Sequence, residues 1–136
     1  MDSIKTYAAP LGRLLMCSLF IWAGYTKLFM FGPSGTAGYM ASVHMPLPEL
    51  AAWVAIIVEL VGGILLLIGY QTRWVALVLA IWCVITGVAV HLPAGDQANM
   101  IHFFKNLVMA GGFLFVVAHG AGGLSVDGAM GTDKAA

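Results

Sequence analysis

One uninterrupted apolar stretch, residues 54–70, carries a single acidic residue, Glu59, near its middle. The stretch is apolar enough to cross a bilayer, where a carboxylate costs about 2.5–3.5 kcal/mol on insertion scales. Gly62 and Gly63 follow Glu59 at the third and fourth positions, so they share its helix face and let a second backbone come close. We therefore predict that Glu59 points into a helix bundle, that it has a partner there, and that the two glycines lie in an interface.

The composition places the whole chain in a membrane. Its 136 residues are 61% hydrophobic and only 9% charged, whereas soluble domains carry about 25% charged residues. The mean hydropathy is +0.95. The formal net charge is zero, so nothing in the composition points to a nucleic-acid partner.

Apolar segments separated by Gly, Pro and polar residues predict an all-α, integral membrane four-helix bundle in a single domain, residues 1–136. The predicted spans are residues 8–31, 48–69, 73–91 and 101–120. The long loop before residue 48 has room for a short interfacial helix or a re-entrant turn. The Gly-rich tail, residues 121–136, is expected to be partly disordered.

The basic residues predict the orientation of the bundle. Four spans put both termini on one side of the membrane. The basic residues that fall on that side are Lys5, Arg13, Arg73 and Lys134. The two opposite loops, residues 32–47 and 92–100, contain no Lys or Arg. The positive-inside rule then predicts that the N- and C-termini are cytoplasmic.

Three charged side chains remain in the cores of the predicted spans: Lys27, Glu59 and Lys105. Helical side chains lean toward the N-terminus of their helix, so Lys27 and Glu59 lean toward each other, and Lys105 leans toward the outer interface. Counting about 1.5 Å per residue puts Glu59 roughly 16 Å below the outer edge and Lys105 roughly 6 Å below it. We predict a buried Lys27–Glu59 pair, and Lys105 with Asn106 facing a ligand. The alternative is that the pair only fixes helix packing.

The remaining polar residues give weaker indications. His91 and His102 flank the same outer vestibule, but no carboxylate accompanies them, so no metal site is predicted. Cys17 and Cys83 lie in apolar segments without a CxxC or zinc spacing, which favours buried hydrophobic residues and leaves their redox state open.

At the inner edge of the bundle, Arg13 leans back toward the interface, where Asp127 of the tail is a candidate partner with a structural role. At the outer half, Lys105 and Asn106 suit a polar or anionic head group attached to an apolar body. A quinone is one molecule of that kind.

Four short motifs occur in order along the chain: residues 24–27 (GYTK), 59–63 (ELVGG), 105–107 (KNL) and 124–127 (LSVD). With Arg13 early in the first span, this order resembles the DoxX family of small bacterial inner-membrane proteins. The resemblance covers the chain from about Leu11 to Asp127. It implies a multi-pass, four-helix domain in the bacterial inner membrane.

The resemblance also implies a link to redox work. The family is named for relatives of a quinone-reducing thiosulfate oxidoreductase subunit, and some members are tied to oxidative-stress complexes. This sequence shows none of the extra domains of the sulfur-oxidising relatives, and no haem pair, flavin motif or CxxC, so that substrate is not carried over.

The predicted function is therefore a small component of a redox or stress-response system that binds a quinone-like or amphipathic ligand. Its expected partners are membrane lipids, a redox partner protein and further copies of the chain. The alternative is a non-catalytic assembly or cargo-binding membrane protein whose charges only lock the helices. The residues identify no catalytic group.

Overall fold

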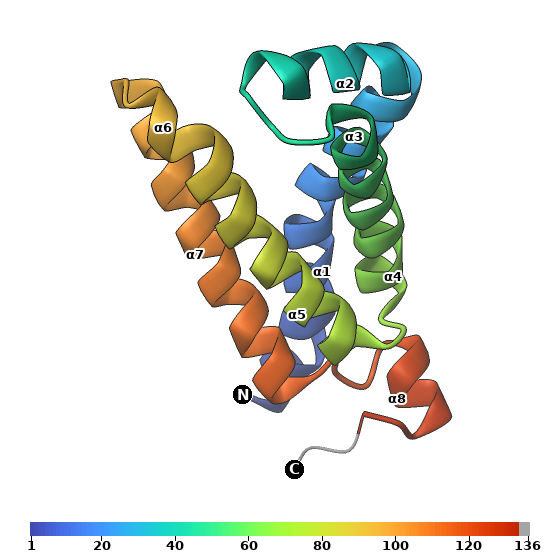
Figure 1. Ribbon diagram of the computed structural model, residues 1–136. Helices are drawn as coiled ribbons and strands as arrows, with labels where there is room; N and C mark the ends of the chain where they lie inside the picture. Colours follow the sequence, from blue (N-terminus) through green and yellow to red (C-terminus); the bar gives the residue numbers. More distant parts are fainter. Residues whose placement is uncertain (134–136) are drawn as a thin grey trace.

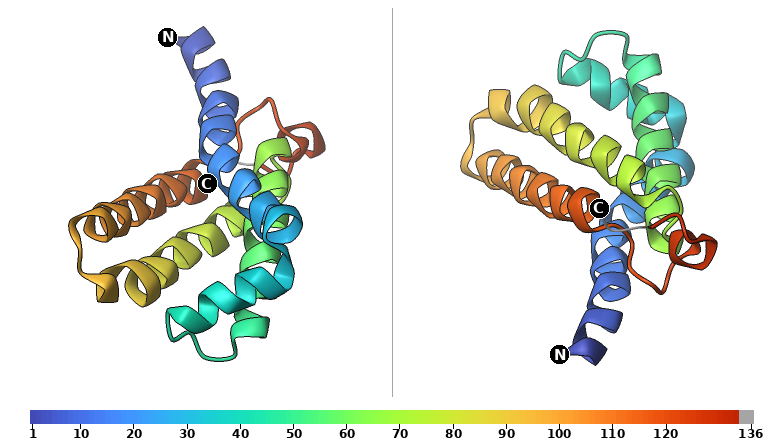
Figure 2. Two further views of the ribbon diagram at one scale, coloured as in Figure 1. Left: turned by 90° about the horizontal axis from the view of Figure 1, so that it is seen from above. Right: turned by 90° about the horizontal axis from the view of Figure 1, so that it is seen from below.

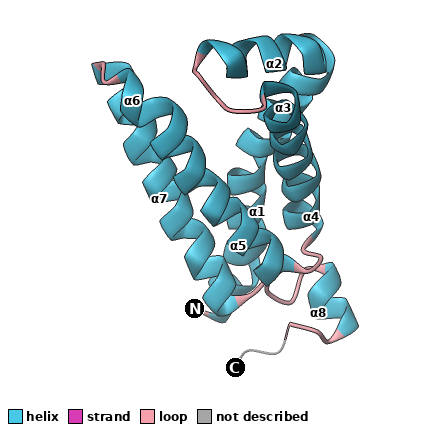
Figure 3. Cartoon of the chain, in the orientation of Figure 1, coloured by secondary structure: helices cyan, strands magenta, loops and turns pink. Residues whose placement is uncertain are grey.

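A computed structural model describes residues 1–133, and every regular element in that range is a helix (Figures 1 and 3). Three elements are π-helical turns, written η. The elements in chain order are α1 (Asp2–Tyr25), η1 (Thr26–Met30), α2 (Gly32–Ser42), α3 (Pro48–Ile56), η2 (Ile57–Val61), α4 (Gly62–Ile68), α5 (Thr72–Thr86), η3 (Gly87–His91), α6 (Leu92–Ala94), α7 (Gln97–His119) and α8 (Val126–Met130). Lys134, which entered the predicted orientation, lies outside the described residues.

Consecutive elements join into four rods that are long and apolar enough to cross a membrane, which confirms the predicted all-α bundle of four spans. The four spans are Ser3–Met30, Pro48–Ile68, Thr72–Ala94 and Gln97–His119. In Figure 1 both termini lie at one end of the bundle, and α2 and α6 lie at the other. We call the end with α2 and α6 the distal end.

Two spans begin earlier than the sequence predicted. The first helix starts at Asp2 instead of residue 8, and it continues through Pro10. The fourth starts at Gln97 instead of residue 101, because the Asp96 carboxylate accepts a hydrogen bond from the backbone N–H of Asn99 at 3.0 Å and so caps the helix. Residues 2–7 were predicted to precede the first span and residues 97–100 to belong to a loop, but both groups form the first turns of a helix.

The long loop between the first two spans contains the helix α2, which lies across the distal end of the bundle (Figures 1 and 2). The Thr36 hydroxyl of α2 donates to the backbone carbonyl of Lys27 at 3.0 Å. Met40, on the same helix, packs with the fully buried Ala52 and Ala55 of α3. The loop therefore contains a helix, and α2 is joined to the ends of both neighbouring spans.

Glycines let the second span lie close to its neighbours. A methyl group placed on Gly24 of α1 would lie 2.6 Å from the backbone nitrogen of Leu60, and one on Gly63 would lie 2.8 Å from the nearest side-chain atom of α1. A methyl group on Gly62 would lie 3.2 Å from Cδ2 of Leu79 in α5. The two glycines after Glu59 thus face different helices, and the carboxylate side of the span lies between α1 and α5.

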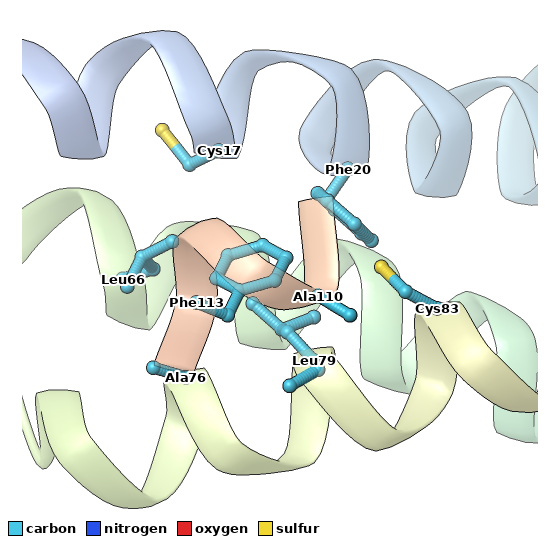
Figure 4. Close-up of a cluster of buried hydrophobic side chains, with 9 residues drawn as sticks. Cys17, Phe20, Leu66, Ala76, Leu79, Cys83, Ala110 and Phe113 are labelled. Atoms are coloured by element: carbon cyan, nitrogen blue, oxygen red, sulfur yellow. The ribbon is translucent and has the colours of Figure 1, made fainter. Parts of the chain in front are cut away.

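A cluster of buried side chains joins the four spans near the middle of the bundle (Figure 4). The fully buried Phe113 of α7 contacts Phe20 of α1 edge to face, with ring centroids 5.3 Å apart. The cluster consists of Cys17, Phe20, Leu66, Ala76, Leu79, Ala80, Cys83, Ala110 and Phe113. Both cysteines are buried free thiols, and they lie at opposite ends of the cluster in Figure 4.

The tail folds back onto the end of the bundle that carries the termini. The Asp127 carboxylate accepts from the backbone N–H groups of Gln71 at 2.9 Å and Thr72 at 2.8 Å, and from the Thr72 hydroxyl at 2.7 Å. These donors begin α5, so the carboxylate satisfies free N–H groups at a helix N-terminus. Residues 121–133 are thereby tied to the turn between α4 and α5.

Arg13 does not pair with Asp127 as the sequence reading expected. Its Nη2 donates to the backbone carbonyl of Leu124 at 2.6 Å, and no ion pair within residues 1–133 joins it to the Asp127 carboxylate. Both carboxylate oxygens already accept from the α4–α5 turn, which accounts for the difference. Arg13 is buried, and it connects α1 to the tail through that carbonyl.

Candidate ligand-binding site

Lys27, Glu59 and Trp82 form a polar network between three spans, in which Glu59 is buried and the other two residues are partly buried. Lys27 Nζ lies 2.6 Å from Glu59 Oε2, and Trp82 Nε1 donates to Glu59 Oε1 at 3.1 Å. The ion pair that the sequence predicted is therefore present. The sequence analysis did not predict that Trp82 takes part. Tryptophans are common at the edges of a membrane, so the only available signal was that Trp82 lies deep within an apolar span. Both oxygens of the carboxylate have a donor, which a buried charge requires.

Each of the first three spans carries a π-helical turn that contributes a polar side chain to this region. Lys27 belongs to η1, Glu59 to η2 and His91 to η3. π-Helical turns are rare, and within α-helices they occur frequently at functional sites. In this bundle the three π-helical turns lie where the spans carry these polar side chains.

Asn106 joins α7 to α5. Its side-chain Nδ2 donates to the backbone carbonyl of Cys83 at 3.1 Å and to the Thr86 hydroxyl at 3.0 Å. The side-chain amide therefore serves the contact between two helices. Its side-chain oxygen is the group that it can still offer to the site.

Lys105 lies one residue earlier on α7 and is exposed. It lies eight residues after Gln97, the first residue of α7, which places it roughly 12 Å along the helix from its start. No ion pair or hydrogen bond joins its ammonium group to another residue in the described part of the chain. Lys27 and Lys105 thus differ: the first is neutralised by Glu59, and the second has no acidic partner.

These residues line a cleft of about 850 Å³ between the first two spans and the α5–α7 hairpin. Figure 1 shows the hairpin diverging from α1 and α3 toward the distal end, with α2 across the top. The polar side chains that line the cleft are Lys27, Tyr39, Glu59, Trp82, Cys83, Thr86, His91, His102, Lys105 and Asn106. Aliphatic and aromatic side chains supply the remaining walls, among them Leu19, Phe20, Ala23, Met40, Val90, Ile101, Phe104, Val108 and Met109.

The cleft is bordered on one side by exposed residues of α1 and α7. Leu19 of α1 is 50% exposed, and Phe104 and Val108 of α7 are 58% and 75% exposed. Such apolar side chains on the outside of a membrane bundle face acyl chains. The cleft can therefore receive an apolar molecule sideways from the lipid, between α1 and α7.

Two histidines lie at the distal end of the cleft. His91 Nδ1 is 2.9 Å from Asn99 Oδ1, and the rings of His91 and His102 are 5.2 Å apart. The nearby Asp96 carboxylate is bonded to Asn99, whose side-chain amide and backbone N–H hold the pKa of Asp96 below its usual value. Within residues 1–133 no group of three His, Cys, Asp or Glu side chains is close enough to hold a metal ion.

Comparison with known proteins identifies the family of the chain. A family model described as DoxX matches residues 8–92, the segment that contains Lys27, Glu59 and Trp82. The chain is 37% identical to inner membrane protein YphA of Escherichia coli (strain K12) over 122 residues, which cover 86% of each protein. It is 34% identical to inner membrane protein YqjF of the same organism over 127 residues, which cover 93% of this chain and 95% of YqjF. No solved structure matches significantly.

The relatives and the four spans together place the chain in the bacterial inner membrane as a multi-pass protein.

Proposed function

This chain belongs to the DoxX family, and from that premise we propose that it is a small component of a redox or stress-response system whose cleft binds a quinone-like, amphipathic ligand. The ligand's head group lies near Lys105 and the Lys27–Glu59 pair. Its apolar body lies along the wall formed by α1 and α7 and extends into the lipid.

The cleft itself is the observation that carries the proposal. Small-molecule sites are typically concave spaces of about 300–1,000 Å³ that are mostly apolar and contain a few convergent polar groups. A cleft of about 850 Å³ with aliphatic and aromatic walls around Lys27, Glu59 and Lys105 fits that description. Its border of exposed apolar residues suits a ligand that arrives from the membrane.

The redox or stress-response part of the proposal has a different support. It rests on the resemblance to a family with quinone-linked and oxidative-stress relatives, and the cleft is compatible with it because quinones combine a polar ring with an apolar chain. Neither cysteine contributes to an exposed reactive site, since both thiols are buried. We therefore assign the chain a binding role within such a system.

The alternative function is assembly or cargo binding without a small-molecule ligand. The observation that favours it is the completeness of the Glu59 network, since Lys27 and Trp82 already satisfy both carboxylate oxygens. A network of this kind can serve helix packing alone. Lys105 distinguishes the two functions, because packing gives it no partner.

The test is the thermal stability of the detergent-solubilised protein with and without a short-chain quinone. A ligand that binds only the folded state raises stability by mass action. We expect the quinone to raise the unfolding temperature of the parent, and to have little effect on Ala23→Phe, in which a larger side chain fills the cleft from α1. Val108→Phe, which fills it from α7, should behave in the same way.

Leu15→Phe is the matched control, because Leu15 is an exposed residue of α1 outside the cleft. It should keep the quinone effect of the parent. A parent protein that no quinone stabilises, or equal stabilisation of Ala23→Phe and Leu15→Phe, would reject the cleft as the quinone site and favour the assembly function.

A further inference from the structure

The cleft holds one more positive charge than its own acidic residues neutralise. The Glu59 carboxylate is engaged by Lys27 and Trp82, with one oxygen bonded to each. Asp96 is exposed at the distal end and is bonded to Asn99. Lys105 is therefore a residue of the cleft lining whose ammonium group forms no ion pair with a carboxylate of the described chain.

Lys105 is exposed, but it lies within a membrane span, where an ammonium group needs a partner or access to water. It lies roughly 12 Å along α7 from the helix start, and Phe104 and Val108 stand beside it on the cleft wall. An unpaired charge among apolar groups is unfavourable, and lysines within membrane spans pair with other groups or mark the path of a substrate or ion. A negatively charged group inside the cleft would supply the missing partner.

We propose that the ligand is a monoanionic amphiphile, whose head group pairs with Lys105 and whose apolar tail leaves the cleft between α1 and α7. The inference rests on the proposed function, since it names the class of ligand for the same cleft. A carboxylate or phosphate oxygen accepts from an ammonium in a short, charge-assisted hydrogen bond. The border formed by Leu19, Phe104 and Val108 gives the tail an apolar surface.

Charge separates this class from neutral amphiphiles of the same shape. A neutral carbonyl can accept a hydrogen bond from Lys105, but it leaves the ammonium charge without compensation. An anion both accepts the bond and neutralises the charge, and hydrogen bonds between ionised groups are roughly twice as strong as those between neutral ones. The same anionic chemistry occurs in a free fatty acid and in the phosphodiester of an acidic membrane lipid.

The experiment compares palmitate with methyl palmitate, which has the same tail without the charge. The full-length protein is reconstituted in phosphatidylcholine nanodiscs at about pH 8.5, where the carboxyl group is ionised. We expect palmitate to raise the unfolding temperature by about 3 °C or more, and methyl palmitate to raise it by less than half as much. Lys105→Gln should remove the difference, whereas Lys105→Arg, which keeps the charge, should retain it.

Two further arms identify the source of the anion and control for bulk charge. Phosphatidylglycerol nanodiscs without palmitate should stabilise the parent over Lys105→Gln if an acidic lipid head group occupies the site, and show no such effect if the ligand is a free acid. Lys5→Gln removes a cation at the other end of the bundle and should leave every response unchanged.

The outcomes separate this inference from the proposed function. If quinone stabilises the protein, but palmitate acts no more strongly than its methyl ester and phosphatidylglycerol has no effect that depends on Lys105, the anionic class is wrong and the quinone-like ligand stands. If neither quinone nor any anionic amphiphile acts through the cleft, both proposals fail.

Discussion

Glu59 is the residue around which the polar part of the bundle is arranged. Its carboxylate has one oxygen on Lys27 and one on the Trp82 indole, so three spans meet at a single side chain. The Lys27 partner could be predicted because each helical side chain leans toward the N-terminus of its own helix, and the first two spans run in opposite directions. The Trp82 partner could not be predicted. Its contact with Glu59 depends on how the third span is rotated about its axis, and the apolar pattern of that span does not determine the rotation.

The ion pair leads to a prediction about unfolding. Removing one partner leaves a buried unpaired charge, so Glu59→Gln and Lys27→Met should each lower the free energy of unfolding by about 3–5 kcal/mol. The double variant should recover much of this loss, because no unpaired charge remains. The measurement is a double-mutant cycle by chemical unfolding in mixed micelles. Additive losses would show that the two side chains do not stabilise each other.

Asp127 leads to a second prediction, about how the stability of the protein depends on pH. Burial acts to raise the pKa of its carboxyl, but hydrogen bonds from the Thr72 hydroxyl and from the backbone N–H groups of Thr72 and Gln71 outweigh burial and lower the pKa. A carboxyl with a lowered folded-state pKa stabilises the protein above its unfolded pKa of about 3.9, and loses that contribution as the pH falls through the folded pKa.

Asp127→Asn should therefore cost about 1.5–3 kcal/mol at neutral pH, the usual loss for hydrogen bonds to a charged group. The difference from the parent should stay constant down to about pH 5 and shrink below about pH 4. Urea unfolding in nonionic detergent across this range measures it. Glu49→Gln, at an exposed site in the first turn of α3, is the control. A difference that grows in acid would contradict the assigned role.

At the scale of elements, the sequence predicted the four membrane-spanning helices better than the residues at which they begin. Residues 2–7 were predicted to precede the first span and residues 97–100 to lie in a loop, although the first group belongs to a helix and Asp96 caps the helix that contains the second. The π-helical turns were not foreseen, because they are a change in the hydrogen-bond ladder and leave no composition signal. The bonds from Asn106 to α5 were not foreseen either, because the sequence does not determine which face of α7 packs against α5.

The crossing of α1 over the second span provides the prediction at this scale. Gly24→Ala would place a methyl group 2.6 Å from the Leu60 backbone nitrogen, so the helices must separate, at a cost of about 1–3 kcal/mol. Gly12→Ala is the matched control on the same helix, because no atom lies within 4 Å of its added methyl group. Thermal unfolding of both variants checks this. Equal effects would show that the close approach at Gly24 is absent.

For the whole molecule, hydropathy was enough to predict four spans, whereas the cleft was not predictable in shape. Its volume arises because the α5–α7 hairpin diverges from α1 and α3 toward the distal end, as Figure 1 shows. The spans meet in the cluster around Phe113, and α2 packs on α3 at the distal end. No single segment of the sequence carries that information.

The orientation of the bundle is a prediction at the scale of the whole molecule. The end that carries the termini holds Lys5, Arg13 and Arg73, and the distal loops hold no Lys or Arg. Reporter fusions at the C-terminus should therefore report the cytoplasm, and fusions between residues 92 and 100 the periplasm. A periplasmic C-terminus would reverse the assignment and place the cleft in the inner half of the bilayer.

The central claim, that the cleft holds an amphipathic ligand, is tested most directly by mass spectrometry of the protein extracted in mild detergent from its own membrane. Ligands that reach the cleft sideways from lipid should remain bound through purification if the affinity is sufficient. We predict that the parent and Leu15→Phe carry the same quinone or acidic amphiphile in comparable amounts, and that Ala23→Phe carries severalfold less. An identical set of bound molecules in all three proteins would contradict the account.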